Sequence, residues 1–218
     1  MSVPVLTIDG PSGAGKGTVS RAVAKQMGWN YLDSGSIYRS LAIAVLQKKC
    51  DIADVKSVVQ IAKTMVLEFE CGDELIVKLN GQDITSELPS QTTANTASIV
   101  ATYPEVRAVL LQKQRDFQKA PGLVADGRDM GTVVFPSALK KAYLTASAKE
   151  RGKRRYKQLL EKGINANLAE ITKEIEVRDR RDQERSAAPL KKADDALYID
   201  SSELPIEKVI EEVLNLVR

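Results

Sequence analysis

The chain has 218 residues, of which 43% are hydrophobic and 28% charged, and its formal net charge is +3. This balance fits one globular domain with small inserts, and no apolar run reaches the roughly 18 residues of a membrane span. Histidine is absent, which excludes Ser-His-Asp and Cys-His catalysis and zinc sites with histidine ligands. Cys50 and Cys71 are expected to be structural thiols. The first residues lack the basic segment of a signal peptide, so we expect a cytoplasmic protein.

The N-terminal part of the chain predicts strands that alternate with helices. Val3–Ile8 and Asn30–Leu32 show the short apolar pattern of buried strands. A glycine-rich turn over residues 10–17 follows the first strand. Helices are expected over Thr18–Met27, Ser34–Gln47 and Asp51–Lys63, the last with Asp51 near its N-cap. This order is typical of a parallel α/β sheet.

The pattern changes between residues 64 and 87, which predict a small antiparallel insert. Met65–Glu70 and Leu75–Leu79 are expected to be strands, joined by a turn at Cys71-Gly72-Asp73. Asn80-Gly81 is a strong hairpin signal, and Asp83–Thr85 is expected to form a third strand.

The rest of the chain returns to alternating helices and strands. Helices are expected over residues 91–101, 104–118, 149–162, 168–185 and 206–217, and short strands over residues 123–126, 133–134, 142–144 and 196–199. The helix over residues 149–162 is basic, since Lys149 to Lys157 carry six positive charges and one negative.

The stretch from Asp9 to Thr18 contains G-x-x-x-x-G-K between a predicted strand and a predicted helix, the context that a phosphate-binding loop requires. Glycines let successive N–H groups turn toward a phosphate chain, and Lys16 can reach the β- and γ-phosphates of a nucleotide. The ATP-binding candidates are Gly10, Pro11, Ser12, Gly13, Ala14, Gly15, Lys16, Gly17 and Thr18. Gly17 stands where the general motif has Ser or Thr, so the hydroxyl that can serve as a metal ligand comes one place later, at Thr18.

A phosphate loop alone does not separate a kinase from a switch or a motor. The guanine-binding string N-K-x-D and the γ-phosphate string D-x-x-G are absent from the sequence, which speaks against a GTPase switch. The dinucleotide-binding string G-x-G-x-x-G is absent as well. The modest net charge favours a small anionic ligand over a broad nucleic-acid surface.

A second group of polar residues follows the strand over residues 123–126. Its last residue, Asp126, is placed like an acid that holds Mg²⁺ directly or through water. Arg128 and Asp129 follow immediately, beside this expected metal site. The alternative is a simple ion pair on a turn.

Two further sets of residues suit anionic ligands. Ser34 and Arg39, at the start of a predicted helix, can bind and clamp a phosphate, unless Ser34 or Asp33 is only an N-cap. Spacings of three and four residues place one set on a single helix face, which is otherwise an exposed salt-bridged surface: Arg178, Arg181, Asp182 and Arg185. A second basic helix suits a mobile lid over ATP through Arg151, Arg154 and Arg155.

These motifs together, in this order and spacing along nearly the whole chain, resemble the bacterial cytidylate kinases. The resemblance implies transfer of the ATP γ-phosphoryl group to CMP or dCMP, with Mg²⁺ as the cofactor. It implies catalytic roles for Lys16, Arg128, Arg181 and Arg185. It assigns the acceptor phosphate to Ser34, Arg39, Arg128 and Arg185, cytosine to Ser98, Arg107 and Asp129, and the sugar hydroxyls to Arg178 and Asp182. The metal would lie near Thr18 and Asp126, and Arg151, Arg154 and Arg155 would belong to the lid.

The expected fold is α/β: a parallel-sheet P-loop core with helices on both faces, a small antiparallel β insert and a helical lid. We expect one kinase unit, with its core in residues 1–33, 102–147 and 186–218, a nucleoside-monophosphate-binding region in residues 34–101, and lid and acceptor-side helices in residues 148–185. The expected partners are ATP, CMP and dCMP, with no nucleic acid, no membrane and a monomeric state. The rival interpretations are a P-loop kinase for UMP, AMP or a metabolite, and a nucleotide-dependent switch or RNA-binding module.

Overall fold

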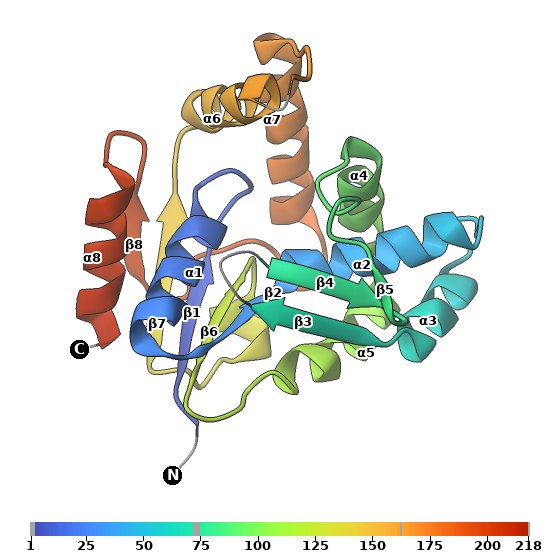
Figure 1. Cartoon of the computed structure of the whole chain (residues 1–218), viewed down its shortest axis with the longest axis horizontal. Coiled ribbons are helices and arrows are strands. Elements are labelled where there is room, and N and C mark those ends of the chain that lie inside the picture. Colours follow the sequence, from blue (N-terminus) through green and yellow to red (C-terminus); the bar gives the residue numbers. More distant parts are fainter. Residues whose placement is uncertain (1–2, 72–74, 162, 218) are drawn as a thin grey trace.

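The centre of the molecule is a five-stranded parallel sheet with the strand order β2-β6-β1-β7-β8 (Figure 1). The computed structural model describes residues 3–71, 75–161 and 163–217. The strands are β1 (Val5–Asp9), β2 (Asn30–Asp33), β6 (Leu123–Gly127), β7 (Lys140–Thr145) and β8 (Leu197–Asp200). Every residue of β1 and β6 is buried, as expected for parallel strands that are covered on both faces.

Helices cover both faces of this sheet. On one face, α1 (Lys16–Met27) and α8 (Ile206–Val217) bury Val19, Val23 and Val213 against the strands. On the other, α2 (Ser34–Gln47) and α5 (Pro104–Arg115) bury Leu41 and Leu110. Because β-strands of a parallel sheet need such cover, the two apolar clusters hold the carboxyl ends of the strands in fixed positions.

The antiparallel insert lies beside α2, as Figure 1 shows, with strands β3 (Leu67–Cys71), β4 (Leu75–Leu79) and β5 (Gln82–Asp83). Its inner face adds Val77 and Leu79 to the larger apolar cluster, and the ring of Phe69 meets that of Phe117 edge-on at 5.1 Å. The helices α3 (Val55–Thr64) and α4 (Gln91–Val100) flank it in sequence.

Two helices stand above the carboxyl edge of the sheet, at the top of Figure 1: α6 (Ala148–Glu161) and α7 (Leu168–Glu184). They pack against each other, and α7 also contacts α4. In the described part of the chain, no helix combines the length and apolar character needed to cross a membrane.

The structure confirms the parallel core and the antiparallel insert and corrects several boundaries. The third helix is capped by Asp54, which accepts the Ser57 N–H, and not by Asp51. The third insert strand lies at Gln82–Asp83 rather than Asp83–Thr85. The turn expected at residues 71–73 falls largely outside the described residues.

The prediction of a strand at residues 133–134 is wrong. Residues 130–134 form a single wide helical turn, η1 (Met130–Val134). The β-branched pair Val133-Val134 suggested a strand, but both N–H groups donate to the Asp129 carbonyl oxygen and so cannot join a sheet.

Candidate active site

A cavity of about 780 Å³ opens at the carboxyl edge of the sheet, between the start of α1, the start of α2, and helices α4, α6 and α7. Predicted residues that line it are Ser12, Gly13, Gly15, Lys16, Gly17, Thr18, Arg39, Asp126, Arg128, Arg154, Arg155 and Arg178. Ligand sites of open parallel sheets lie at this edge. A larger hollow of about 1270 Å³ lies between α1 and β3, but none of the predicted site residues lines it.

The phosphate loop joins β1 to α1. Gly15 is the N-cap of α1 with φ 94°, a left-handed conformation that glycine adopts without strain. Lys16 is only 6% exposed, and its Nζ donates to the Pro11 carbonyl oxygen at 3.0 Å. Burial, followed by the charge of Arg128, lowers the pKa of Lys16 to about 7. An anionic ligand in the cavity would reverse this effect, because it would favour the charged ammonium.

Two carboxylates face the phosphate loop across the cavity. Asp126 accepts a hydrogen bond from the Tyr31 hydroxyl at 2.9 Å, and burial, followed by the charge of Asp33, raises its pKa to about 6. Asp33 caps α2 by accepting the Ser36 N–H and also lines the cavity. The two negative charges oppose each other, an arrangement that a bound cation would relieve. Among the described residues, no group of three or more acidic or cysteine side chains forms a complete metal site.

The arginines that line the cavity come from four helices, α1, α2, α6 and α7, and from the loop after β6. Arg39 donates to the Leu88 carbonyl oxygen at 2.6 Å, and Arg155 donates to that of Pro89 at 3.2 Å. Arg154 is bonded to Ser201, at the end of β8. The contacts of Arg39 and Arg155 tie α2 and α6 to the segment that precedes α4, and the contact of Arg154 ties α6 to the residue after β8.

Arg178 carries the clearest sign of a missing ligand. Its buried Nε has no hydrogen-bond acceptor among the described residues, and burial lowers its pKa to about 9. Nη2 of Arg185, also buried, likewise lacks a hydrogen-bond partner there. Buried donors are normally satisfied, so the unpartnered Nε of Arg178, which lines the cavity, points to an anion. Arg185 differs, because the carboxylate of Asp129 lies 3.6 Å from its Nη2.

Arg151 differs from the other lid candidates. It is buried, donates to the carbonyl oxygens of Ala146 and Ser12, and forms an ion pair with Asp179 of α7. It does not line the cavity. Arg151 therefore supports the phosphate loop from behind and joins α6 to α7.

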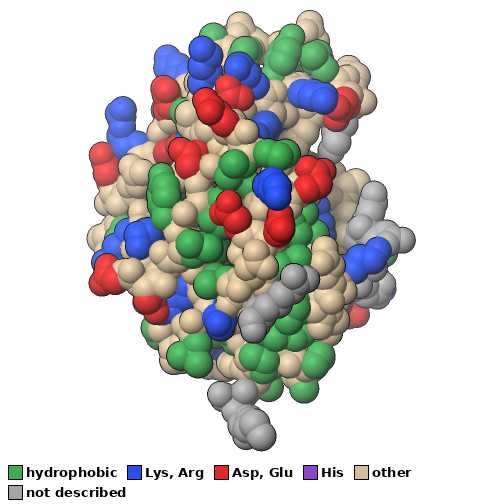
Figure 2. Space-filling model, turned by 90° about the vertical axis from the view of Figure 1, so that its left-hand side faces the viewer, with side chains coloured by type: hydrophobic (Ala, Val, Ile, Leu, Met, Phe, Trp, Pro, Cys, Tyr) green, Lys and Arg blue, Asp and Glu red, His purple; other side chains and the backbone are tan. Residues whose placement is uncertain are grey.

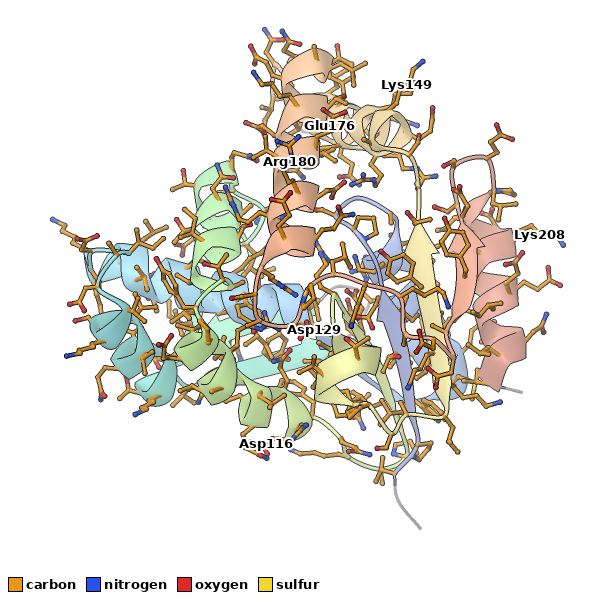
Figure 3. The ribbon with its side chains drawn as sticks, turned by 180° about the vertical axis from the view of Figure 1, so that it is seen from behind. Asp116, Asp129, Lys149, Glu176, Arg180 and Lys208 are labelled. Atoms are coloured by element: carbon orange, nitrogen blue, oxygen red, sulfur yellow. The ribbon has the colours of Figure 1, made fainter. Side chains whose placement is uncertain are left out.

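A polar cluster next to the cavity centres on Asp129, which is 3% exposed and lies at the foot of α7 in Figure 3. Asp129 Oδ2 forms an ion pair with Arg107, while its Oδ1 lies 3.6 Å from Arg185 Nη2. The guanidinium of Arg107 stands over the ring of Tyr38, 5.5 Å from its centroid. Arg128, which directly precedes Asp129, donates a hydrogen bond to Asp182 of α7 at 2.9 Å.

The two predicted serines form hydrogen bonds of their own. Ser34 donates to Oε1 of the fully buried Gln114 at 2.7 Å, and Ser98 accepts from Arg181 at 3.0 Å. The residues expected to hold CMP thus form separate bonded groups rather than one network, chiefly Arg107 and Arg185 with Asp129, Arg128 with Asp182, and Arg181 with Ser98. Several of the predicted residues do not line the cavity itself: Ser34, Ser98, Arg107, Asp129, Arg181, Asp182 and Arg185. Gly10, Pro11 and Ala14 likewise lie behind the lining of the phosphate loop.

Sequence reasoning missed several residues of this site: Asp9, Tyr31, Tyr38, Gln114 and Asp179. Tyr31 and Asp9 belong to strands and carried no motif signal beyond their places next to the two loops. Gln114 and Asp179 lie on helix faces whose partners only the tertiary structure supplies.

Comparison with known proteins agrees with this geometry. The family described as cytidylate kinase matches residues 6–218. A cytidylate kinase from Methylococcus capsulatus (strain ATCC 33009 / NCIMB 11132 / Bath) is 52% identical over 217 residues, which cover 100% of this chain and 98% of that protein.

Two solved structures are more distant. A gluconokinase from Sinorhizobium meliloti 1021 has a TM-score of 0.46 at 12% identity, covering 99% of this chain and 91% of its own. A shikimate kinase from Acinetobacter baumannii has a TM-score of 0.42 at 18% identity, covering 99% and 93%. Both similarities are too low to support an argument. The family match and the relative that is similar over its full length show that the chain belongs to the cytidylate kinase family.

Proposed function

We propose that this chain transfers the γ-phosphoryl group of ATP to CMP or dCMP, giving ADP and CDP or dCDP. The observation that carries the proposal is the buried Nε of Arg178, which has no hydrogen-bond acceptor among the described residues although Arg178 lines the cavity beside the phosphate loop. Family membership gives the reaction class and the acceptor.

The ATP side of the site consists of the phosphate loop and the lid arginines. Residues Gly10 to Thr18 would wrap the phosphate chain with backbone N–H groups, and Lys16 would hold the β- and γ-phosphates. Arg154 and Arg155 line the cavity and would close over the donor. Arg151 would act by keeping the Ser12 carbonyl, and with it the loop, in place.

The acceptor side consists of positive charges directed at one phosphate. Arg39 and Arg128 line the cavity. Ser34 stands between two lining residues in the chain, and Arg185 pairs with Asp129, the residue after Arg128. Two anions must approach each other for transfer, so these cations and Lys16 would offset their repulsion in a site that closure shields from water. The acceptor phosphate is itself the nucleophile, so the absence of histidine is no obstacle.

Recognition of the base falls to the cluster around Asp129. Its Oδ1 lies beyond hydrogen-bond distance of Arg185 and is the oxygen that can accept from the amino group of cytosine. Arg107 and Ser98 would complete the contacts to the base, and Arg178 with Asp182 would hold the sugar hydroxyls. Arg181, which donates to Ser98, would orient that serine.

Mg²⁺ fits the donors that are present. Asp126 and Asp33 offer carboxylate oxygens whose mutual repulsion a cation would relieve, and Thr18 offers a hydroxyl on the same cavity. A Cβ at Gly17 would lie 3.6 Å from Asp126 Oδ2, so the first turn of α1 directly faces this carboxylate. When bound, Mg²⁺ neutralises charge on the transferring phosphate.

The three expected parts of the chain meet around this cavity. The region of residues 34–101 contacts the lid through the Arg155 bond to Pro89 and through a 2.8 Å bond from Gln91 to Glu174 of α7. We propose that these contacts form as the lid closes. We also propose that the chain is a monomer. We propose that it binds small nucleotides rather than nucleic acid, since positive and negative side chains are intermixed on the face in Figure 2 and form no continuous basic surface there.

A matched pair of substitutions on α7 tests the proposal. Arg178→Ala removes a buried guanidinium from the cavity, and Arg180→Ala removes an exposed one two residues away, labelled in Figure 3. We expect Arg178→Ala to lower kcat/KM for CMP by about 100-fold or more, the scale of a charge-assisted contact in a closed site. Arg180→Ala should stay within about twofold of the unsubstituted enzyme. Equal effects from both would contradict the proposal.

A further inference from the structure

Asp9 is a buried carboxylate to which neither the sequence motifs nor the proposed contacts with substrate assign a role. It is the last residue of β1, directly before the phosphate loop, and is 4% exposed. Its Oδ1 accepts the N–H of Met130 and its Oδ2 accepts the N–H of Gly131, each at 2.8 Å. The side chain therefore holds two successive backbone groups of η1 with two separate oxygens.

The backbone of Asp9 holds the other end of the same loop. In the parallel ladder between β1 and β6, Asp9 stands opposite Gly127. Residues 127–131 thus leave the sheet opposite Asp9 and return to its carboxylate. Arg128 and Asp129 are the two residues between these attachment points, so one residue sets the position of both.

The loop also packs tightly where it meets β1. A Cβ at Gly131 would lie 2.8 Å from Thr7 Oγ1 and 3.1 Å from Lys141 Cδ, closer than side chains normally tolerate. The side chain of Met130 is fully buried beside it. Because the packing leaves no room for the loop of residues 127–131 to shift, its hydrogen bonds to Asp9 hold it in one position.

Two backbone donors and a costly burial act in opposite directions on the Asp9 carboxylate. Burial raises the pKa of Asp9 to about 7, against the opposing effects of the two backbone N–H groups and of Lys16. The charge of Asp129 raises it further. A neutral side chain would cost less to bury. An ionised carboxylate, however, is acceptor-only, so it can take both N–H donors without presenting a donor of its own.

We propose that Asp9 is a positioning residue for the acceptor nucleotide, fixing the loop that carries Arg128 and Asp129 relative to the phosphate loop. The inference rests on the proposed function, which assigns Arg128 and Asp129 to CMP. Asp9 itself touches neither substrate; it joins the segment that holds the donor to the segment that holds the acceptor. A misplacement of about 1 Å between two such segments can cost roughly 100-fold in rate.

Asp9→Asn tests this role, because it keeps the shape of the side chain but turns an amide NH₂ toward one of the two N–H donors. We expect KM for CMP to rise about tenfold or more, while KM for ATP stays within about twofold. Hydrogen exchange of the Met130 and Gly131 amides in the ligand-free protein should become faster. Asp54→Asn is the matched control: Asp54 also accepts a backbone N–H, that of Ser57 at 3.2 Å, but it is exposed and caps α3. It should change neither KM.

A purely structural role would reduce the fraction of folded enzyme, which lowers kcat and leaves KM for CMP unchanged; that result, or unchanged exchange at both amides, would overturn the inference. If Asp9→Asn does not fold, Gly131→Ala moves the same loop away from an intact carboxylate and should give the same rise in KM for CMP. An unchanged KM for CMP in Gly131→Ala would also overturn it. Amide exchange needs no substrate, so it distinguishes failure of this inference from failure of the proposed function, which would show as no turnover of CMP by the unsubstituted chain.

Discussion

Replacing Asp129 by Asn changes the residue proposed to distinguish cytosine from uracil. The Asp129 carboxylate pairs with Arg107 through Oδ2 and leaves Oδ1 3.6 Å from Arg185. In Asp129→Asn, the amide oxygen would stay on Arg107, which can only donate, and the NH₂ would take the place of Oδ1. A donor would then face the base, where uracil offers a carbonyl oxygen and cytosine an amino group.

The size of the effect follows from burial. Asp129 is only 3% exposed, so its surroundings exclude water. If uracil binds there, its carbonyl oxygen faces the carboxylate oxygen of Asp129, and both acceptors stay unpaired. Sites of this kind discriminate between substrates by up to about 10⁴-fold. The substitution should reduce the CMP-over-UMP preference by at least about tenfold, or roughly 1.4 kcal/mol. Removing the charge also leaves two buried arginines without their partner, so stability should fall by about 3 kcal/mol or more.

The assay is kcat/KM for CMP and for UMP in the unsubstituted enzyme and in the variant. Their ratio does not depend on the fraction of folded enzyme, so the loss of stability does not distort it. If the ratio is unchanged, Asp129 does not read the base, and its role is to hold Arg107 and Arg185.

Three further results are expected. Lys16→Ala should lower kcat by about 100-fold or more while circular dichroism shows a retained fold; normal turnover would contradict the assignment of the phosphate loop. Because the ligand-free Lys16 has a pKa of about 7, it is mostly neutral at pH 8, and bound phosphates should recharge it, so ATP binding at pH 8 should take up a proton. Calorimetry in buffers of different ionisation enthalpy measures this uptake, which Lys16→Met should abolish; equal uptake in both proteins would refute the explanation. Chelation of Mg²⁺ should stop turnover but leave the Kd for CMP within about twofold, since the residues assigned to CMP are not those assigned to the metal; a lost CMP affinity, measured by calorimetry, would contradict that separation.

Much of the fold was predictable because local patterns and tertiary packing agree. Ser34–Gln47 and Ile206–Val217 form helices with the predicted bounds, since their apolar faces repeat at the helical period and both faces of the sheet need cover. The hairpin at Asn80-Gly81 also follows from its residues, both of which adopt positive φ. Residues 133–134 have a local preference for a strand, but they form part of a helical turn, because the hydrogen bonds of the loop bound by Asp9 outweigh that preference.

The site was predictable to the extent that its residues lie in motifs. Lys16, Asp126 and Arg128 lie close in sequence to glycines and strand ends, which are patterns that indicate a functional site. The partners that bury and orient them are not: Tyr31 meets Asp126 from 95 residues away, and Gln114 meets Ser34 from 80. Such contacts depend on how strands and helices stack, and a single sequence carries no direct signal of that arrangement.

The central claim is the choice of acceptor, and a panel of nucleoside monophosphates tests it most directly. With ATP and Mg²⁺ at fixed concentrations, kcat/KM should be highest for CMP and dCMP and lower for UMP by a factor of about 100 or more, because the buried acceptor at Asp129 suits cytosine alone among the pyrimidines. AMP and GMP should be poor acceptors as well. Equal or faster turnover of UMP or AMP would contradict the account.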